Sequence, residues 1–232
     1  MAHWTYKQTP DPDSLEQGDL LQKTEALNAI LKLYHPYYAD HADNEFFIVL
    51  TQSCDLARRS GSKCTSRYIS LAPVRSLKAV LKREFEENLE NTSMGSQPFA
   101  SARTRGTLEQ FLERLFNNND ASFFYLENLP TAGVASDMCA LLSLPIAIKS
   151  EHYAVCFSSR VLSIEDAFQA KLGWLIGQLY SRVGTKDWPN VDLKKKVADA
   201  IAKAAVWVVD DDAKALVRLC EDARRADPNV II

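Results

Sequence analysis

A short polar cluster, Gln52 to Asp55, follows an apolar run and holds the side chains best suited to chemistry. The cluster ends on a thiol, Cys54, and a carboxylate, Asp55. A cysteine beside a base and an orienting group can act as a nucleophile. A thiol-dependent hydrolase centred on Cys54 and Asp55 is therefore one hypothesis, although a small buried hydrophobe is the commoner role for such a cysteine. The base could come from any of three histidines: His35, His41 and His152.

A zinc site is a second hypothesis for the same region. Cysteine and histidine are the usual protein ligands of zinc, and four of them fall within 30 residues. These candidates are His35, His41, Cys54 and Cys64. Their spacing matches no standard zinc finger or ribbon, so buried cysteines and hydrogen-bonded or exposed histidines are the alternative interpretation.

The segment that follows, residues 56–83, is strongly basic within an acidic chain. It contains eight basic residues and no acidic one, so removing its charge of +8 from the total of −3 leaves −11 for the rest. Clusters of Lys and Arg are typical of surfaces that bind phosphate groups. The segment predicts a nucleic-acid-binding surface, with a solvated face as the alternative. The candidate binding residues are Arg58, Arg59, Lys63, Arg67 and Arg75.

Composition places few other limits on function. Apolar residues make up 47% and charged residues 25% of 232 residues, as in a soluble globular protein. The apolar runs are too short to span a bilayer and no secretory signal is seen, so we expect no membrane partner and a cytoplasmic location. Five cysteines without a CxxC motif indicate a reducing compartment. Neither glycine-rich motif that binds nucleotide phosphates occurs.

The pattern of apolar residues predicts an α+β fold: a small antiparallel, barrel-like sheet with flanking and inserted helices and a helical C-terminus. Strands are predicted at 18–21, 46–50, 67–74, 122–126, 139–148 and 153–162. Helices are predicted to begin after Thr24, Ser76 and Ser163 and at the capping box Thr107–Gln110. The strands at 46–50 and 67–74 are expected to pair antiparallel, with the basic turn between them.

Three parts of the chain are predicted. Residues 1–16 read as a flexible arm, and residues 17–186 as the barrel-like domain with a helical insertion at 76–117. Residues 187–232 read as a C-terminal pair of helices, at about 192–208 and 211–225.

Several strand segments resemble, in order, those of the MazF/PemK toxin family. They are Gly18-Asp19-Leu20-Leu21, Ile48-Val49-Leu50-Thr51 and Leu71-Ala72-Pro73-Val74. Ser159 to Ile164, leading into a helix, is similar to the family's last strand and terminal helix. The resemblance covers about 18–75 and 140–182. It implies an SH3-like barrel that cuts RNA, and a role of the bacterial toxin–antitoxin or anti-phage defence kind.

The catalytic positions of that family are not matched. Asn44-Glu45 stand where the family has a basic residue before its second strand, and Arg75 stands in place of its catalytic threonine. The resemblance thus implies the sheet more than the ribonuclease activity.

Three functions remain open on the sequence. The first is nucleic-acid interaction, with RNA favoured, through the basic segment. The second is a non-enzymatic interaction or regulatory protein whose amphipathic helices, 164–182 and 192–225, pack against a partner protein. The third is the thiol- or zinc-dependent hydrolase at Cys54. Whether the chain is an enzyme, and whether it forms an oligomer, stays open as well.

Overall fold

The fold is described from a computed structural model that covers residues 5–58, 63–88, 93–94, 97–98, 102–181, 195 and 210–227. The chain divides into two compact units, residues 1–182 and 183–232. The predicted domain boundary at residues 186–187 lies outside the described residues, as does Arg59. Every helix within the described ranges is too short or too polar to cross a lipid bilayer.

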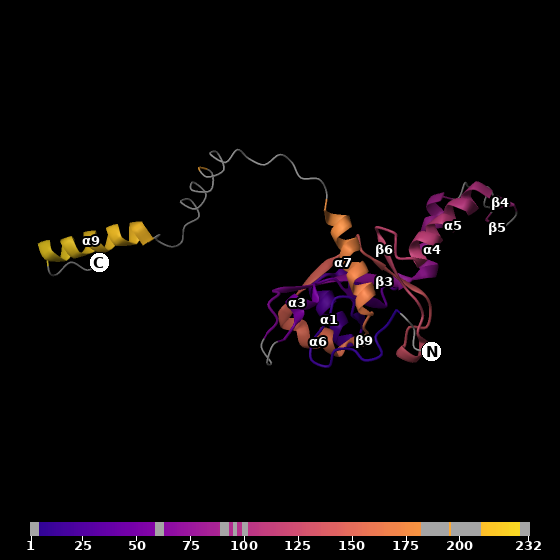
Figure 1. The fold of residues 1–232 in the computed structure, drawn as a ribbon, viewed down its shortest axis with the longest axis horizontal. Coiled ribbons are helices and arrows are strands. Elements are labelled where there is room, and N and C mark those ends of the chain that lie inside the picture. The colour runs from indigo at the N-terminus through magenta and orange to yellow at the C-terminus, as the bar shows by residue number, and fades with distance from the viewer. Residues whose placement is uncertain are drawn as a thin grey trace. The chain divides into compact units, whose positions relative to one another are not determined.

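An antiparallel sheet forms the centre of the first unit (Figure 1). Its strands follow the order β6-β7-β3-β2-β1-β9, and β8 also pairs with β3. The α+β class is confirmed, and so is the antiparallel pairing of β2 with β3, in which Phe46 lies opposite Val74. The sheet is not closed into a barrel, because β6 and β9 end the order instead of pairing with each other. The strands are β1 (Leu20–Gln22), β2 (Phe46–Val49), β3 (Tyr68–Ser76), β6 (Phe123–Leu126), β7 (Met138–Leu141), β8 (Ile146–Lys149) and β9 (Arg160–Leu162).

Helices lie against both faces of this sheet. The α-helices are α1 (Glu25–Tyr34), α2 (Pro36–Asp40), α3 (Ser53–Leu56), α4 (Leu77–Asn88), α5 (Ala102–Phe116), α6 (Tyr153–Ser158) and α7 (Asp166–Tyr180). Short 3-10 helices occur at η2 (Pro130–Ala132) and η3 (Ser150–His152). Together α4 and α5 project from the sheet, and the small strands β4 (Ser93–Met94) and β5 (Gln97–Pro98) lie between them in the chain (Figure 1).

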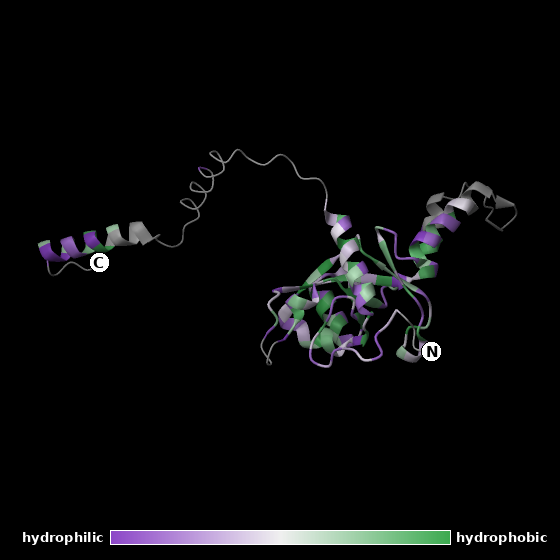
Figure 2. Ribbon diagram, viewed as in Figure 1, coloured by the Kyte–Doolittle hydropathy of each residue, from purple (hydrophilic) through white to green (hydrophobic). Residues whose placement is uncertain are grey.

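Alternation of side chains along the strands builds a separate core on each face. Ile48 of β2 packs in the core that includes Leu172 of α7. The next residue back, Phe47, packs in the core that includes Leu27 of α1 and Cys156 of α6. Figure 2 shows apolar residues concentrated in the strands and in the helix faces next to them. Both faces of β2 are therefore buried, which explains its uninterrupted apolar sequence.

Several predicted elements differ from the observed ones. Residues 35–41 contain α2, which was not among the predicted helices, and the predicted 139–148 strand is two strands, β7 and β8, separated by a turn. The predicted strand at 153–162 is α6 followed by β9, because Tyr153 and Cys156 are buried at helical spacing. The capping box at Thr107 lies inside α5, which already begins at Ala102.

The caps of α1 and α4 are confirmed. Thr24 Oγ1 accepts a hydrogen bond from Leu27 N at 3.3 Å, and Ser76 Oγ accepts one from Ala79 N at 3.2 Å. The predicted cap of α7 is wrong, because its N-cap is Glu165. Ser163 instead donates its hydroxyl to the buried carboxylate of Asp19.

Residues 5–16 pack against the sheet, contrary to the flexible arm predicted there. Tyr6 and Leu15 are buried, and Tyr6 forms a β-bridge with Ile164. Arg160 of β9 secures the segment by donating to the carbonyl oxygens of Asp11 at 2.6 Å and Ser14 at 2.8 Å. The segment around Pro10 and Pro12 has the composition of a loop, but the buried side chains of Tyr6 and Leu15 on either side of it keep it packed against the sheet.

The described part of the second unit is helix α9 (Asp210–Ala226), which agrees with the prediction of 211–225. The predicted helix at 192–208 lies outside the described residues apart from Lys195. Along α9, Val217 and Leu219 are exposed, at 55% and 66%.

Gly18 is expected to be the least replaceable glycine of the sheet core. Its φ of +86° is a left-handed conformation, and a Cβ atom there would collide with the buried side chain of Ile164. We expect Gly18→Ala to lower the free energy of unfolding by about 2–4 kcal/mol, combining backbone strain with the clash. Urea denaturation followed by circular dichroism measures this loss.

Gly133→Ala is the matched control. Gly133 has a similar φ of +82°, but a Cβ atom there meets open space. The control should therefore show only the strain component, about 1 kcal/mol. Equal losses for the two variants would contradict the predicted clash with Ile164.

Candidate functional site

A cavity of about 410 Å³ opens where the loop before β3 meets the end of β8. Among the residues that the structure describes, four basic side chains line it, and Glu151 is the one acidic residue. We call this cavity the basic pocket. Its lining residues are Arg58, Lys63, Cys64, Arg67, Tyr68, Lys149, Ser150, Glu151, Tyr153 and Ala154.

The pairing of β3 with β8 brings the two sides of the basic pocket together. Tyr68, the first residue of β3, lies opposite Lys149, the last residue of β8. Beyond this pair, Ser150 N donates to Arg67 O at 3.0 Å. The register thus brings Lys149 to the end of β3 that follows Arg67, although 82 positions separate Arg67 and Lys149 in the sequence.

The loop that carries Lys63 and Arg67 is fixed by the backbone of α3. Asp55 O accepts hydrogen bonds from Ser66 N at 3.1 Å and from Thr65 Oγ1 at 3.2 Å. A loop held at two points presents its basic side chains in a limited set of positions. The binding of an anion then costs less conformational entropy than with a free loop.

Tyr153 supports the opposite side of the basic pocket. Its hydroxyl donates to Leu56 O at 3.2 Å and accepts from Leu15 N. Burial raises the pKa of Tyr153 above its usual value, so the hydroxyl keeps its proton over a wider pH range than a free tyrosine does. The guanidinium of Arg58 lies over the Tyr153 ring, with its Cζ 5.2 Å from the ring centre. This cation–π contact orients the guanidinium.

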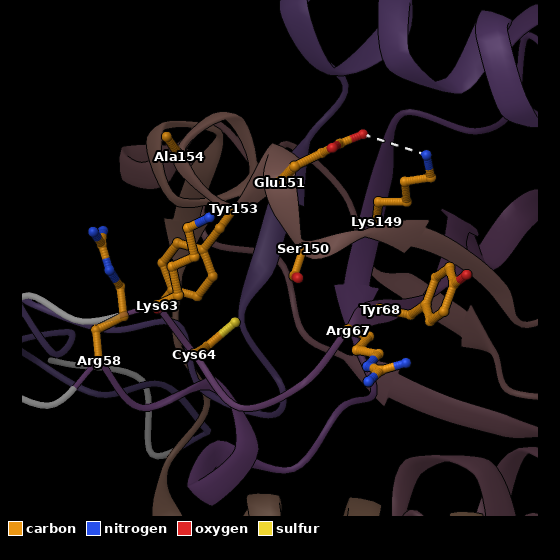
Figure 3. A pocket seen from close by; sticks show the side chains of 10 residues that line it. All are labelled: Arg58, Lys63, Cys64, Arg67, Tyr68, Lys149, Ser150, Glu151, Tyr153 and Ala154. Atoms are coloured by element: carbon orange, nitrogen blue, oxygen red, sulfur yellow. Dashed lines mark ion pairs between the residues drawn. The ribbon is translucent and has the colours of Figure 1, made fainter. Parts of the chain in front are cut away.

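Glu151 pairs with Lys149 and offsets only one of the four basic side chains, so the basic pocket keeps a net positive charge. Lys149 Nζ lies 3.7 Å from a carboxylate oxygen of Glu151, a long and exposed ion pair that contributes little to stability. Figure 3 shows Arg58, Lys63 and Tyr153 along one side, Arg67, Tyr68 and Lys149 along the other, and Ser150 between them. Four cations against one carboxylate, with a hydroxyl and tyrosine rings, suit a phosphate-containing ligand.

The structure brings together three of the five predicted binding residues: Arg58, Lys63 and Arg67. Arg75 does not belong to this group. Arg75 lies seven positions beyond Tyr68 along the extended β3, a distance of about 23 Å. Its guanidinium donates from Nε to Asn44 Oδ1 at 2.8 Å, so it helps to hold the segment before β2.

Cys54 lies on α3 and is exposed, outside the lining of the basic pocket. Its Sγ donates to Gln52 Oε1 at 3.6 Å. Within the described ranges, none of the three candidate histidines is hydrogen-bonded to it. Asp55 holds the loop through its backbone carbonyl, and this structural role accounts for its position.

The four predicted zinc ligands have other partners. His35 Nε2 is hydrogen-bonded to Ala147 O at 2.8 Å, and His41 Nδ1 accepts from Asp43 N at 3.3 Å. Cys64 lies in the basic pocket and donates to Ser66 O at 3.5 Å. Across the part of the chain that is described, no three His, Cys, Asp or Glu side chains form a group suited to a metal ion. The zinc hypothesis therefore gains no support from geometry.

Sequence reasoning missed half of the basic pocket. Lys149 is the last residue of β8, and Ser150 and Glu151 follow it. The prediction of one strand from 139 to 148 did not show where β8 begins and ends. The alternation Ile146-Ala147-Ile148-Lys149 is the signal that could have located it, because only Ile146 and Ile148 are buried.

A second cavity, of about 520 Å³, lies between the start of α4 and the turn at Ser136–Asp137. Its lining combines apolar side chains with Lys78 and Lys82. Asp137 in its wall already accepts hydrogen bonds from Asn128 N at 3.0 Å and Nδ2 at 2.8 Å. The balance of charge there is less positive than in the basic pocket.

Comparison with known proteins returns no relative. No protein-family model, no curated protein and no solved structure matches the chain.

Proposed function

We propose that this protein binds nucleic acid through the basic pocket, with RNA favoured. The observation that carries the proposal is the convergence of Arg58, Lys63 and Arg67 with Lys149 around one cavity of about 410 Å³. Three of these residues come from the basic segment and the fourth from a distant strand. Phosphate groups are the anions that such clusters bind most often in nucleic-acid-binding proteins.

The toxin or defence role and RNA cleavage rest on the resemblance of short sequence segments. The sheet is open, so it does not support the SH3-like barrel that the resemblance implies. The proposal is therefore limited to binding, since no complete set of catalytic groups accompanies the phosphate-binding residues among those described.

Exposed apolar residues on α9 favour the second candidate, a partner protein. Leu219 is 66% exposed on α9, a helix rich in charged residues, and an amphipathic helix of this kind can dock into an apolar groove. The two functions are compatible, because α9 belongs to a different unit from the basic pocket.

Salt dependence tests the proposal. Neutralising four phosphates should give a slope of log Kobs against log salt of about −3 for a single strand. Fluorescence anisotropy of a labelled oligouridylate, measured from about 50 to 200 mM salt, gives the slope. A flat slope, or the absence of binding at the lowest salt concentration, would contradict binding through the four cations.

A further inference from the structure

A group of aromatic rings, of which Tyr34 and Tyr37 are exposed and the others half-buried, begins beside the basic pocket. His152 follows the pocket residue Glu151, and its Nε2 lies 3.3 Å from the hydroxyl of Tyr34. The two ring centres are 5.6 Å apart. Tyr34 ends α1, and Tyr37 in α2 has its ring centre 5.8 Å from that of His41. We call these rings, Tyr34, Tyr37, Tyr38, His41 and His152, the aromatic row.

The aromatic row is attached to the same strand as the basic pocket. The hydrogen bond from His35 to Ala147 joins the connection between α1 and α2 to β8, two residues before Lys149. The phosphate-binding and aromatic residues therefore belong to one supported surface.

The rings of Tyr34 and Tyr37, at the junction of α1 and α2, are exposed and do not serve to fill the core. Tyr37 is 67% exposed and Tyr34 is 36% exposed, and Leu33 beside them is 71% exposed. Tyr38, in contrast, is partly buried and packs against the core that includes Leu27. Tyr34 contacts His152, the neighbour of the pocket residue Glu151, and exposed apolar side chains near a charged cavity indicate a binding surface.

We propose that the ligand of this surface is single-stranded nucleic acid, whose bases stack on Tyr34 and Tyr37 while a neighbouring phosphate occupies the basic pocket. This inference rests on the proposed function and specifies its ligand. Basic grooves next to aromatic side chains are typical of single-strand binding, because every unpaired base offers a ring face. In a duplex those faces are stacked inside the helix and are closed to tyrosine rings.

The test compares single-stranded and duplex RNA of equal length, again by anisotropy. Tyr34→Leu with Tyr37→Leu keeps two apolar side chains but removes both rings. Affinity for the single strand should fall about tenfold or more per ring, while the salt slope should stay unchanged because stacking releases no counterions. Affinity for the duplex should not change.

Two matched variants accompany this pair. Tyr34→Phe with Tyr37→Phe retains the rings and should retain most of the affinity for the single strand. Tyr180→Leu removes a tyrosine of similar exposure, 56%, from α7 and should have no effect. Circular dichroism spectra would establish that all variants are folded.

The outcomes separate the inference from the function on which it rests. If Tyr34→Leu with Tyr37→Leu binds the single strand as tightly as the unchanged protein, or weakens single strand and duplex equally, stacking is wrong. Nucleic-acid binding would then still stand, provided that loss of Arg67 and Lys149 weakens it. A protein that binds neither RNA at low salt would overturn both proposals.

Discussion

Replacement of Arg67 and Lys149 by alanine should weaken nucleic-acid binding by about 100-fold at low salt, if each cation makes one charge-assisted contact of about 1.5 kcal/mol. The two residues lie on the same side of the basic pocket, across the pairing of β3 with β8. The salt slope should fall in magnitude by about 1.4, or about 0.7 for each phosphate on a single strand that the variant no longer neutralises. Anisotropy titrations at several salt concentrations measure both quantities.

Lys78→Ala with Arg114→Ala is the matched control. It removes one lysine and one arginine, and thus the same total charge, from outside the basic pocket. Lys78 belongs to the same basic segment by sequence, but it lines the second cavity. If binding depends only on net charge, both double variants weaken it equally. If the second cavity is the true site, the control loses affinity and the Arg67 and Lys149 variant does not.

Asp19→Ala should lower the free energy of unfolding by about 3–5 kcal/mol, as expected when one partner of a buried ion pair is removed. Asp19 is fully buried, and its carboxylate accepts hydrogen bonds from Glu16 N at 2.8 Å and Arg160 Nη1 at 3.2 Å. It also accepts the Ser163 hydroxyl. Truncation of Asp19 leaves the nearly buried guanidinium of Arg160 and the buried hydroxyl of Ser163 without the carboxylate that accepts from them. Urea denaturation followed by circular dichroism provides the measurement.

Asp13→Ala serves as the control for this loss. Asp13 lies on the same N-terminal segment but is exposed, so its removal should change the free energy of unfolding by no more than about 0.5 kcal/mol. Equal effects of the two substitutions would show that the buried network contributes nothing specific.

The Asp19 network also predicts a pH dependence. Burial raises the pKa of Asp19 above its usual value, while hydrogen bonds from Ser163, Glu16 and Arg160 oppose that rise. The folded protein therefore holds this proton to a higher pH than the unfolded chain does. Stability contributed by this group falls as the pH rises from the unfolded pKa to the folded pKa. Asp19→Asn, which cannot titrate, should lose that part of the pH dependence.

Local signals in the sequence predicted much of the fold correctly. The apolar run from Phe46 to Val49 is a buried strand, and Thr24 and Ser76 cap the helices that follow them. These features depend on neighbouring residues only, so periodicity and capping rules suffice to find them.

What the sequence could not provide were the long-range pairings. The partnership of Tyr68 with Lys149, which creates the basic pocket, depends on sheet register that no local pattern encodes. Likewise Ser163 has the residue type of a helix cap, but a stronger partner, the buried Asp19, takes its hydroxyl. The prediction that Arg75 and Arg67 share one binding site was wrong, because residues that are close in sequence lie far apart along an extended strand.

Protection of Cys64 from alkylation tests the central claim most directly. Cys64 lines the basic pocket, while Cys54 is exposed outside it. Burial raises the pKa of Cys139 and Cys156 to about 12, so these two thiols should not react in the folded protein. Mass spectrometry after treatment with iodoacetamide gives the rate at each cysteine, with and without single-stranded oligouridylate.

If nucleic acid occupies the basic pocket, RNA should slow the alkylation of Cys64 and leave the rate at Cys54 unchanged. An unchanged rate at Cys64 when the anisotropy change is complete would contradict the account, as would equal protection of Cys54 and Cys64.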